Sequence, residues 1–597
     1  MIPMTTKTHQ TTPVLAIPAT VARAATAAGA ALTLGSTFLA WTWTAKFPGD
    51  LTVTGYPGGL QVLTLVGAAL TLLFTLSGYG IKGLRWLTPG GTNSPVRLAA
   101  LGLLGTMGFT VGAISVELGG VVNLEPGAWI GLVGAIITVV ASLGLPHDQD
   151  ITDTATPSPL EKFLNSLRAP APGRPKELPS WAEILIIVAA FGIGLFVVTY
   201  GIDTAYPELF VGYLLITGFA VTALFKAGLM ARLSAITTKY RSIAVAAAFV
   251  AAAVFPFTQS TDQYTLIAVN ILIFATVALG LNIVVGLAGL LDLGYVAFLG
   301  VGAYTAALVS GTSASAFGVQ FPFWASVLLG AAVSLIFGVV IGAPTLRLRG
   351  DYLAIVTLGF GEIFRIAVGN LDGVSGPRVT NGPNGVPNIP DLNFFGYDFG
   401  ESHTILGFEL GAYANYYMLM LLAMILVVLV FSRAGSSRIG RAWVAIREDE
   451  TAATAMGING FRVKLIAFAL GATLAGIAGT VQAHVQSTVV PEMYVFAGPV
   501  PPNSAFLLAA VILGGMGTIS GPLIGAALLY MIPAKLQFLS DYQLLGFGLA
   551  LILLMRFRPE GLIANRRAKL EYHETGQLDV PDETLAGTTS GTTKAGA

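Results

Sequence analysis

Four ionisable residues lie within or beside long apolar stretches of this 597-residue sequence: Asp292, Glu362, Arg365 and Glu183. Charged side chains are costly inside a membrane, so such residues are candidates for function. Glu362 and Arg365 are three positions apart and share one helix face, which favours an internal ion pair. Asp292 allows two interpretations. It either caps the start of a helix, which we favour, or takes part in substrate or proton binding.

Two further features of the apolar stretches could line a route for a solute. Asn270 and Asn282 are polar residues in the stretch before Asp292, where hydrogen bonding between helices is the favoured role. Glycines at 514–521 interrupt a second apolar run, and a broken helix at membrane depth is tolerated only where protein buries it or it lines a cavity. The candidate pathway residues are therefore Asn270, Asn282, Asp292, Gly514, Gly515, Gly517 and Gly521.

The most charged segment lies between two apolar stretches. Residues 438–446 and 451–456 are predicted to form short helices, with an acidic cluster at 448–450 between them and Gly457 capping the second. A short amphipathic helix rich in arginine and carboxylate suits docking into a groove on a soluble protein. Anchoring at the membrane surface is the alternative, and the three consecutive acidic residues disfavour it.

Patterns for catalysis and metal binding are missing from the sequence. It has no cysteine, which excludes disulfides, thiol nucleophiles and cysteine-ligated metals. Its histidines are scattered without metal-ligand spacing. They are His9, His147, His403, His484 and His573. No Gly-Lys pair occurs, so the phosphate loop G-x-x-x-x-G-K-[ST] is absent. We therefore expect no catalytic residue, metal or cofactor in this chain.

The composition places these residues in a membrane. Charged residues make up 10% of the chain and hydrophobic residues 54%, whereas soluble proteins carry about 25% charged residues. Apolar stretches of about 20 residues predict an all-α polytopic membrane protein with about 14–16 transmembrane helices. The last region holds one long broken span or up to three shorter ones. The stretches lie near residues 22–43, 60–80, 97–116, 127–145, 183–200, 209–225, 242–258, 264–287, 290–310, 323–343, 352–368, 411–431, 465–483 and 504–556.

Small residues recur every four positions in one of these stretches, at Ala467, Gly471, Ala475 and Gly479. Such a stripe lets another helix approach closely. A packing seam is favoured over a wall of the permeation route, and one stripe can serve as both.

The distribution of charge predicts how the chain is oriented. With the N-terminus inside, nearly all lysines and arginines fall in cytoplasmic segments and only Lys46 and Arg378 fall outside, as the positive-inside rule requires. We therefore expect both termini in the cytoplasm. Equal numbers of basic and acidic residues, 31 each, argue against a nucleic-acid partner. The outside loop 369–410 either docks an external partner or is a solvated connector, and both interpretations stay open.

Several separated motifs resemble one family. Glu450-x-Ala452-Ala453-x-x-x-Gly457 resembles the coupling-helix loop of ABC importer permeases. Residues 279–310, 346–366 and 513–526 resemble the LivM-type permease subunit of the branched-chain amino-acid ABC transporter family. The resemblance covers roughly residues 240–565 and leaves the first four predicted spans unexplained.

The resemblance implies a binding-protein-dependent importer in the plasma membrane of a prokaryote. Its expected partners are a second homologous permease, two ATP-binding subunits that hold ATP and magnesium, an external solute-binding protein that delivers leucine, isoleucine or valine, and membrane lipid. By position, the contact with the ATP-binding subunits would comprise Arg441, Arg447, Glu448, Asp449, Glu450, Ala452, Ala453 and Gly457.

The expected organisation has four parts. Residues 1–146 form an accessory membrane segment of about four helices, and residues 147–180 form a proline-rich cytoplasmic linker. Residues 181–570 form the permease domain, with the coupling loop at 433–464. Residues 571–597 form a disordered cytoplasmic tail.

Three other functions were weighed against this one. A related ABC permease for urea or short-chain amides shares the architecture. A secondary transporter driven by protons or sodium would need carboxylates near mid-membrane, and the intramembrane charges are few. An integral membrane enzyme would need a catalytic cluster, and the sequence offers none.

Overall fold

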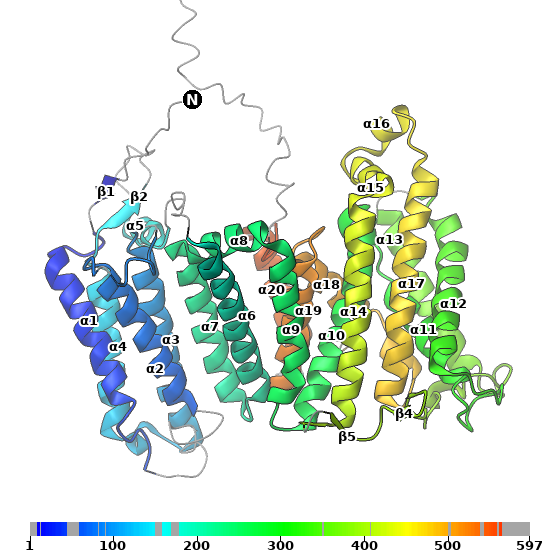
Figure 1. Ribbon diagram of the computed structural model, residues 1–597, viewed down its shortest axis with the longest axis horizontal. Coiled ribbons are helices and arrows are strands. Elements are labelled where there is room, and N and C mark those ends of the chain that lie inside the picture. The colour runs from blue at the N-terminus through cyan, green and yellow to red at the C-terminus, as the bar shows by residue number, and fades with distance from the viewer. Residues whose placement is uncertain are drawn as a thin grey trace, which may run out of the picture. The chain divides into compact units, whose positions relative to one another are not determined.

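The computed structural model describes residues 9–11, 13–43, 59–81, 83–89, 91–149, 158–168, 178–348, 351–405, 408–498, 503–537, 542–557 and 560–563 (Figure 1). Regular structure in these ranges is almost entirely helical, because backbone polar groups inside a bilayer must be satisfied within their own segment. The predicted all-α polytopic fold is confirmed, and the chain is a multi-pass membrane protein.

Ten of the described helices are long and apolar enough to cross a membrane, when the short turns that continue α9 and α10 are included. They are α2 (Gly59–Ser77), α3 (Ser94–Glu117), α6 (Ser180–Asp203), α7 (Pro207–Ala227), α9 (Arg241–Val254), α10 (Asp262–Asn282), α12 (Phe323–Thr345), α13 (Asp351–Asn370), α14 (Ala412–Ser436) and α17 (Gly460–Gln486).

The remaining predicted stretches also contain helices, all shorter than 18 residues except the first, which has 18. These are α1 (Ala19–Ser36), α4 (Pro126–Ser142), α11 (Val296–Leu308), α18 (Ser504–Gly514), α19 (Ser520–Lys535) and α20 (Gln543–Phe557). The region 504–556 thus holds three helices. The predicted total of 14–16 crossings counts these shorter helices as spans, whereas length and composition alone qualify ten within the described residues.

Short elements connect the spans. The helices among them are α5 (Pro159–Ser166), α8 (Leu229–Lys239), α15 (Arg438–Glu448) and α16 (Glu450–Ala455), with the turns η2 (Val121–Asn123), η3 (Phe255–Thr258), η4 (Ile283–Leu287), η5 (Gly382–Asn384) and η6 (Pro491–Tyr494). The strands are β1 (His9–Thr11), β2 (His147–Gln149), β3 (Asn393–Phe394), β4 (Tyr397–Asp398), β5 (His403–Ile405) and β6 (Phe408–Leu410). They pair antiparallel as β1–β2, β3–β4 and β5–β6.

The chain divides into two compact units. The first comprises Met1–Ile271, Asp391–Leu422 and Tyr530–Asp541, and the second comprises Leu272–Pro390, Ala423–Leu529 and Tyr542–Ala597. The helices α10, α14 and α19 therefore each contribute residues to both units.

In the first unit, α1–α4 pack side by side (Figure 1). Glycine lets α1 and α4 approach closely, since a Cβ on Gly29 would lie 2.6 Å from the Thr138 hydroxyl. The same unit packs α3 against α7, where a Cβ on Gly102 would lie 2.5 Å from Phe219. The predicted boundaries of an accessory segment and a permease domain stay predictions. Residues 150–157 and 169–177 of the predicted linker and the predicted tail 571–597 lie outside the described residues.

In the second unit, α17 packs against both α11 and α12. The predicted small-residue stripe of α17 lies in this contact: a Cβ on Gly479 would collide with the Leu299 carbonyl oxygen and lie 2.9 Å from the Ala303 amide nitrogen. Gly302 of α11 lies equally close to the backbone of Gly476. The structure therefore supports the packing interpretation of the stripe.

Candidate functional site

The charged segment 438–459 forms a bent pair of helices, which we call the elbow. The two predicted helices are present as α15 and α16. The Ser437 hydroxyl caps α15 by accepting from the Gly440 amide at 3.1 Å. The Asp449 carboxylate caps α16 by accepting from the Thr451 and Ala452 amides at 2.8 and 3.0 Å. Asp449 is thus both the hinge between the helices and the start of the second.

The elbow is fastened to the first turns of α17 (Figure 1). The indole of Trp443, 1% exposed, donates a hydrogen bond to the Val463 carbonyl at 2.8 Å. The Lys464 ammonium pairs with the Glu450 carboxylate at 2.7 Å, and its side chain is only 5% exposed. A buried ion pair is costly to break, because removing one partner leaves an uncompensated charge. These two contacts join both elbow helices to α17.

The predicted contact residues separate into two faces. Those exposed on the elbow are Arg441, Glu448, Asp449, Ala452 and Gly457. Ala453 is buried, and Arg447 and Glu450 are half-buried with polar bonds directed inward. The exposed face also carries Met456 at 84% exposure, an apolar side chain that the sequence analysis did not select. Gly457, at φ +87°, ends α16 as predicted.

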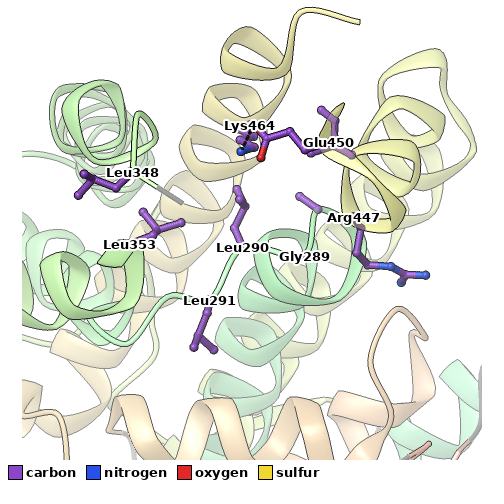
Figure 2. A pocket seen from close by; sticks show the side chains of 10 residues that line it. Gly289, Leu290, Leu291, Leu348, Leu353, Arg447, Glu450 and Lys464 are labelled. Carbon is purple, nitrogen blue, oxygen red and sulfur yellow. Dashed lines mark ion pairs between the residues drawn. The ribbon is translucent and has the colours of Figure 1, made fainter. Parts of the chain in front are cut away.

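A pocket of about 180 Å³ lies beneath the elbow. Figure 2 shows leucines from the η4–α11 segment and from α13 on one side of it, and the Lys464–Glu450 pair across it. Its lining residues are Ala288, Gly289, Leu290, Leu291, Leu348, Leu353, Ile446, Arg447, Glu450 and Lys464. The elbow therefore borders a cavity on part of its inner side, beside the buried side chains Trp443, Ile446 and Ala453.

Asn282 joins the glycine-rich break between α18 and α19. Its side-chain oxygen accepts from the Gly517 amide at 2.8 Å, and its side-chain nitrogen donates to the Thr518 carbonyl at 2.7 Å. The side chain is fully buried. Gly515 and Gly517 have φ angles of +120° and +73°, which a residue with a Cβ rarely adopts. Hydrogen bonding between elements, the favoured role for Asn282, is what the structure shows.

Asn270, Gly514 and Gly521 make contacts that differ from the hydrogen bonds of the Asn282 side chain to the α18–α19 break. The Asn270 amide nitrogen donates to the Leu266 carbonyl of its own helix at 3.0 Å. Gly514 and Gly521 pack directly against each other at the two ends of the break, so a Cβ on Gly514 would collide with the Gly521 carbonyl. The structure brings Asn282 to the break, whereas Asn270 bonds within α10.

Asp292 is not the N-cap of α11, which corrects the favoured interpretation. Tyr295 occupies that position, and the helix begins at Val296. The Asp292 carboxylate instead accepts from the Gly294 amide at 2.9 Å, within the non-helical segment before the helix. It is 1% exposed, and its second oxygen has no hydrogen-bond partner within the described residues. The aspartate stabilises the turn that leads into α11.

The other three charged candidates from the sequence are paired. Glu362 and Arg365 form the predicted ion pair, and Arg365 also binds Glu492 at 2.8 Å. Glu183 pairs with Lys239 at 2.7 Å. Neither Glu492 nor Lys239 could be selected from the sequence, because both stand far along the chain from their partners. The same holds for Lys464, which the sequence marked only as a basic residue at the start of a span.

An all-α multi-pass protein with a charged elbow between two spans has the architecture of a membrane permease subunit. The sequence model of the family described as branched-chain amino acid transport system / permease component matches residues 263–555. The high-affinity branched-chain amino acid transport system permease protein LivM of Salmonella typhimurium is 39% identical over 355 residues, which is 57% of this chain and 79% of the relative. LivM of Escherichia coli K12 is 38% identical over 349 residues, 56% of this chain and 78% of the relative. The chain therefore belongs to this permease family, which confirms the resemblance found in the sequence.

A second permease protein is also similar. LivH of Salmonella typhimurium is 35% identical over 130 residues, which is 21% of this chain and 40% of that relative. No solved structure matches the chain. The family match begins in α10 and ends in α20, so α1–α9 lie outside it.

Proposed function

We propose that this chain is the membrane-spanning permease subunit of an ATP-driven importer. It translocates leucine, isoleucine or valine that an external solute-binding protein delivers. Membership of the permease family and the names of the LivM relatives support this substrate class over urea and short-chain amides. The chain sits in the plasma membrane of a prokaryote with both termini in the cytoplasm.

The proposed partners are those that the resemblance to ABC importer permeases implies. Two ATP-binding subunits hold ATP and magnesium and hydrolyse the nucleotide, since this chain contributes no phosphate loop. A second homologous permease completes the pathway, and the local similarity to LivH supports a pairing of related chains. An ion-coupled secondary transporter is less well supported, because Glu183, Glu362 and Arg365 are paired.

The observation that carries the proposal is the two-faced elbow. It exposes the charged side chains Arg441, Glu448 and Asp449, and a short charged helix pair displayed in this way suits docking into a groove on a soluble protein. Its inner side is anchored to α17 through Trp443 and Glu450. A push on the exposed side by closing ATP-binding subunits would therefore move α17.

Residues 1–146 are proposed to be an accessory membrane segment. The family match starts at residue 263, and one core cluster of α1–α4 is formed by their own apolar residues, such as Ala68, Leu103 and Ala128. The segment would then contribute to stability or anchoring and leave the translocation step to the rest of the chain.

The docking face is tested by placing a negative charge at two of its exposed positions. In the complete importer, Arg441→Glu combined with Met456→Glu is expected to lower ATP-dependent leucine uptake about tenfold or more, because like or unpaired charges at an interface are strongly unfavourable. The ATP-binding subunits should no longer co-purify, while the amount of chain in the membrane is unchanged. The inner anchors are untouched by both substitutions.

The matched control is Glu117→Lys, a charge reversal at an exposed residue at the end of α3. It should leave uptake and co-purification intact. Normal uptake and co-purification in the double variant would refute the docking assignment. Accumulation of leucine against a gradient by the chain reconstituted alone would refute the ATP-driven importer. Uptake of urea or acetamide in place of leucine would change the substrate class.

A further inference from the structure

We propose that Asn282 and the η4 turn form a relay that transmits movement of the elbow to the break between α18 and α19, with Arg447 as its input. The inference deepens the proposed function and rests on it, since the elbow must first receive a force. It assigns three positioning residues, Arg447, Gly286 and Asn282, to the coupling step. All contacts in the relay lie within the second unit.

The first link joins the elbow to η4. The Arg447 guanidinium donates to the Gly286 carbonyl at 2.9 Å and is held in place by the Glu448 carboxylate at 2.7 Å. η4 is a π-turn, in which the Ala288 amide bonds to the Ile283 carbonyl. A π-turn at the end of a long helix is a common functional feature, and here the arginine supplies a donor to the turn's glycine.

The arginine stem strengthens this link by packing on the following glycine. Gly289 has φ +70°, and a Cβ there would lie 2.5 Å from the Arg447 Cγ. Figure 2 shows the stem beside Gly289 and the guanidinium directed away from the Lys464–Glu450 pair. Arg447 therefore anchors the elbow to η4 separately from the anchors on α17.

The second link joins η4 to Asn282. A Cβ on Gly286 would collide with the Asn282 side-chain oxygen and lie 2.6 Å from the Gly517 amide nitrogen. The glycine backbone thus packs directly on the contact between Asn282 and the break. No space remains between these groups, so a displacement of Gly286 must displace the amide or the loop.

The third link is the Asn282 carboxamide itself. It accepts from Gly517 and donates to Thr518 at the same time, which requires a side chain with both a donor and an acceptor. The far side of the break is held separately, because the Leu562 and Ile563 amides donate to the Leu513 and Gly514 carbonyls at 2.8 and 2.9 Å. The loop between these two attachments is the part that a moving Asn282 would turn.

The relay is tested in the complete importer with two single substitutions. Asn282→Ala removes both hydrogen bonds to the break, and Arg447→Met removes the bond to Gly286 while keeping an alkyl stem. Each is expected to lower leucine transported per ATP hydrolysed about tenfold, as for the loss of buried hydrogen bonds, with ATP hydrolysis and subunit co-purification retained. Arg447→Met lies in the elbow and keeps the test valid if Asn282→Ala fails to reach the membrane.

Two controls match the substitutions. Thr276→Val changes another buried polar residue of α10, whose hydroxyl bonds to the Leu272 carbonyl of its own helix at 2.7 Å and to the Met424 sulfur at 3.8 Å, away from the break. Arg438→Met removes an exposed arginine from the same elbow helix as Arg447. Both should retain the transport-to-hydrolysis ratio. Loss of that ratio in the controls to the same extent would overturn the relay.

A double variant distinguishes a relay from two independent sites. Residues that act in one network are non-additive, whereas distant independent residues add. Asn282→Ala with Arg447→Met should therefore be no worse than the more damaging single substitution. A double variant about a hundredfold impaired would mean that the two residues act separately and would overturn the relay.

A direct readout of the break uses the absence of native cysteine. Met516→Cys, at an exposed position of the break, gives one site for maleimide labelling in membranes. In the otherwise unaltered chain its labelling rate should change when the ATP-binding subunits are trapped with nucleotide, and Asn282→Ala should abolish the change. If the variant that carries Met516→Cys alone shows neither the change in labelling rate nor ATP-dependent uptake, the proposed function fails. If the change in labelling rate and the uptake both occur, and both persist when Asn282→Ala is added, only the relay fails.

Discussion

The α1–α4 bundle and the α10–α19 core bury polar side chains in different ways. In the bundle most buried hydroxyls bond to a carbonyl of their own helix. They are Thr26, Thr64, Thr71, Thr75, Thr106, Thr110 and Thr138. A few bundle side chains also bond to another element, among them Thr33 to the Gly131 carbonyl and Gln61 to the Leu39 carbonyl. In the core, bonds within a helix occur beside side chains that bond to a different element. They include Asn282, Tyr295, Trp443 and Arg447.

This difference indicates where movement can be transmitted. A hydroxyl that bonds within its own helix leaves the neighbouring helix free of any directional link, so the bundle is held mainly by close packing. A side chain that bonds to another element fixes the relative position of the two elements. Its hydrogen bond breaks when one element shifts against the other. The core therefore contains the contacts that a coupled conformational change could make and break.

Arg97 is the main exception in the bundle and gives the largest expected effect. It is 1% exposed, and its guanidinium donates to the carbonyls of Ser142, Leu145, Pro146 and Ser166. Arg97→Met should destabilise the bundle by about 3 kcal/mol or more, since each buried acceptor left without a donor costs about 1–3 kcal/mol. Thermal unfolding of the purified protein measures the loss.

Leucine uptake by the same variant tests whether residues 1–146 are accessory to transport. Leucine uptake per molecule of folded Arg97→Met chain should equal that of the unaltered chain if residues 1–146 are accessory. Arg85→Met, which removes an exposed arginine bonded to Gly80, is the stability control. A variant that melts normally would refute the structural role of Arg97, and one that loses uptake while folded would refute the accessory role.

The sequence was sufficient for the features that depend on local composition. Apolar runs located each membrane helix that the structure describes, and the Glu450–Gly457 pattern located the elbow, because both are properties of contiguous residues. Partners across the fold could not be predicted. Nothing near Asn282 in the chain indicates that it binds Gly517, and nothing near Glu450 indicates Lys464. Asp292 was misassigned as a cap because three further non-helical residues separate it from the start of α11 at Val296.

Substitution of a glycine at a helix contact gives the next largest effect. It compares the two regions by how closely a neighbouring helix approaches the glycine. In the core, Gly479→Ala places a Cβ against the backbone of Leu299 and Ala303, where α11 cannot move without losing its packing on α17. We expect a loss of about 1–3 kcal/mol, as for overpacked interiors. In the bundle, Gly105→Ala of α3 meets no atom within 4 Å and should be neutral or stabilising by up to about 1 kcal/mol. Thermal unfolding of both variants in the same detergent measures the difference in stability. Equal melting temperatures would show that the two regions do not differ in glycine packing.

The smallest expected effect tests the comparison of hydrogen bonds most directly. Tyr295→Phe deletes one hydroxyl of the core, which donates to the Gly471 carbonyl on α17 at 2.6 Å. Thr71→Val deletes one hydroxyl of the bundle, which donates to the Gly67 carbonyl of its own helix at 2.8 Å. Both side chains are fully buried. Each substitution keeps the shape of the side chain nearly constant, so the hydrogen bond is the main change.

The two hydrogen bonds should contribute different amounts to the free energy of unfolding. A bond from Tyr295 links two helices and should contribute about 1 kcal/mol, the usual net value for such a hydrogen bond. A threonine that bonds back to its own helix competes with the helical geometry, so its loss should cost less than about 0.5 kcal/mol. If Thr71→Val destabilises the protein as much as Tyr295→Phe, the bonds between elements hold the core no more firmly than the bonds within helices hold the bundle. The core would then have no special set of contacts through which the elbow could act.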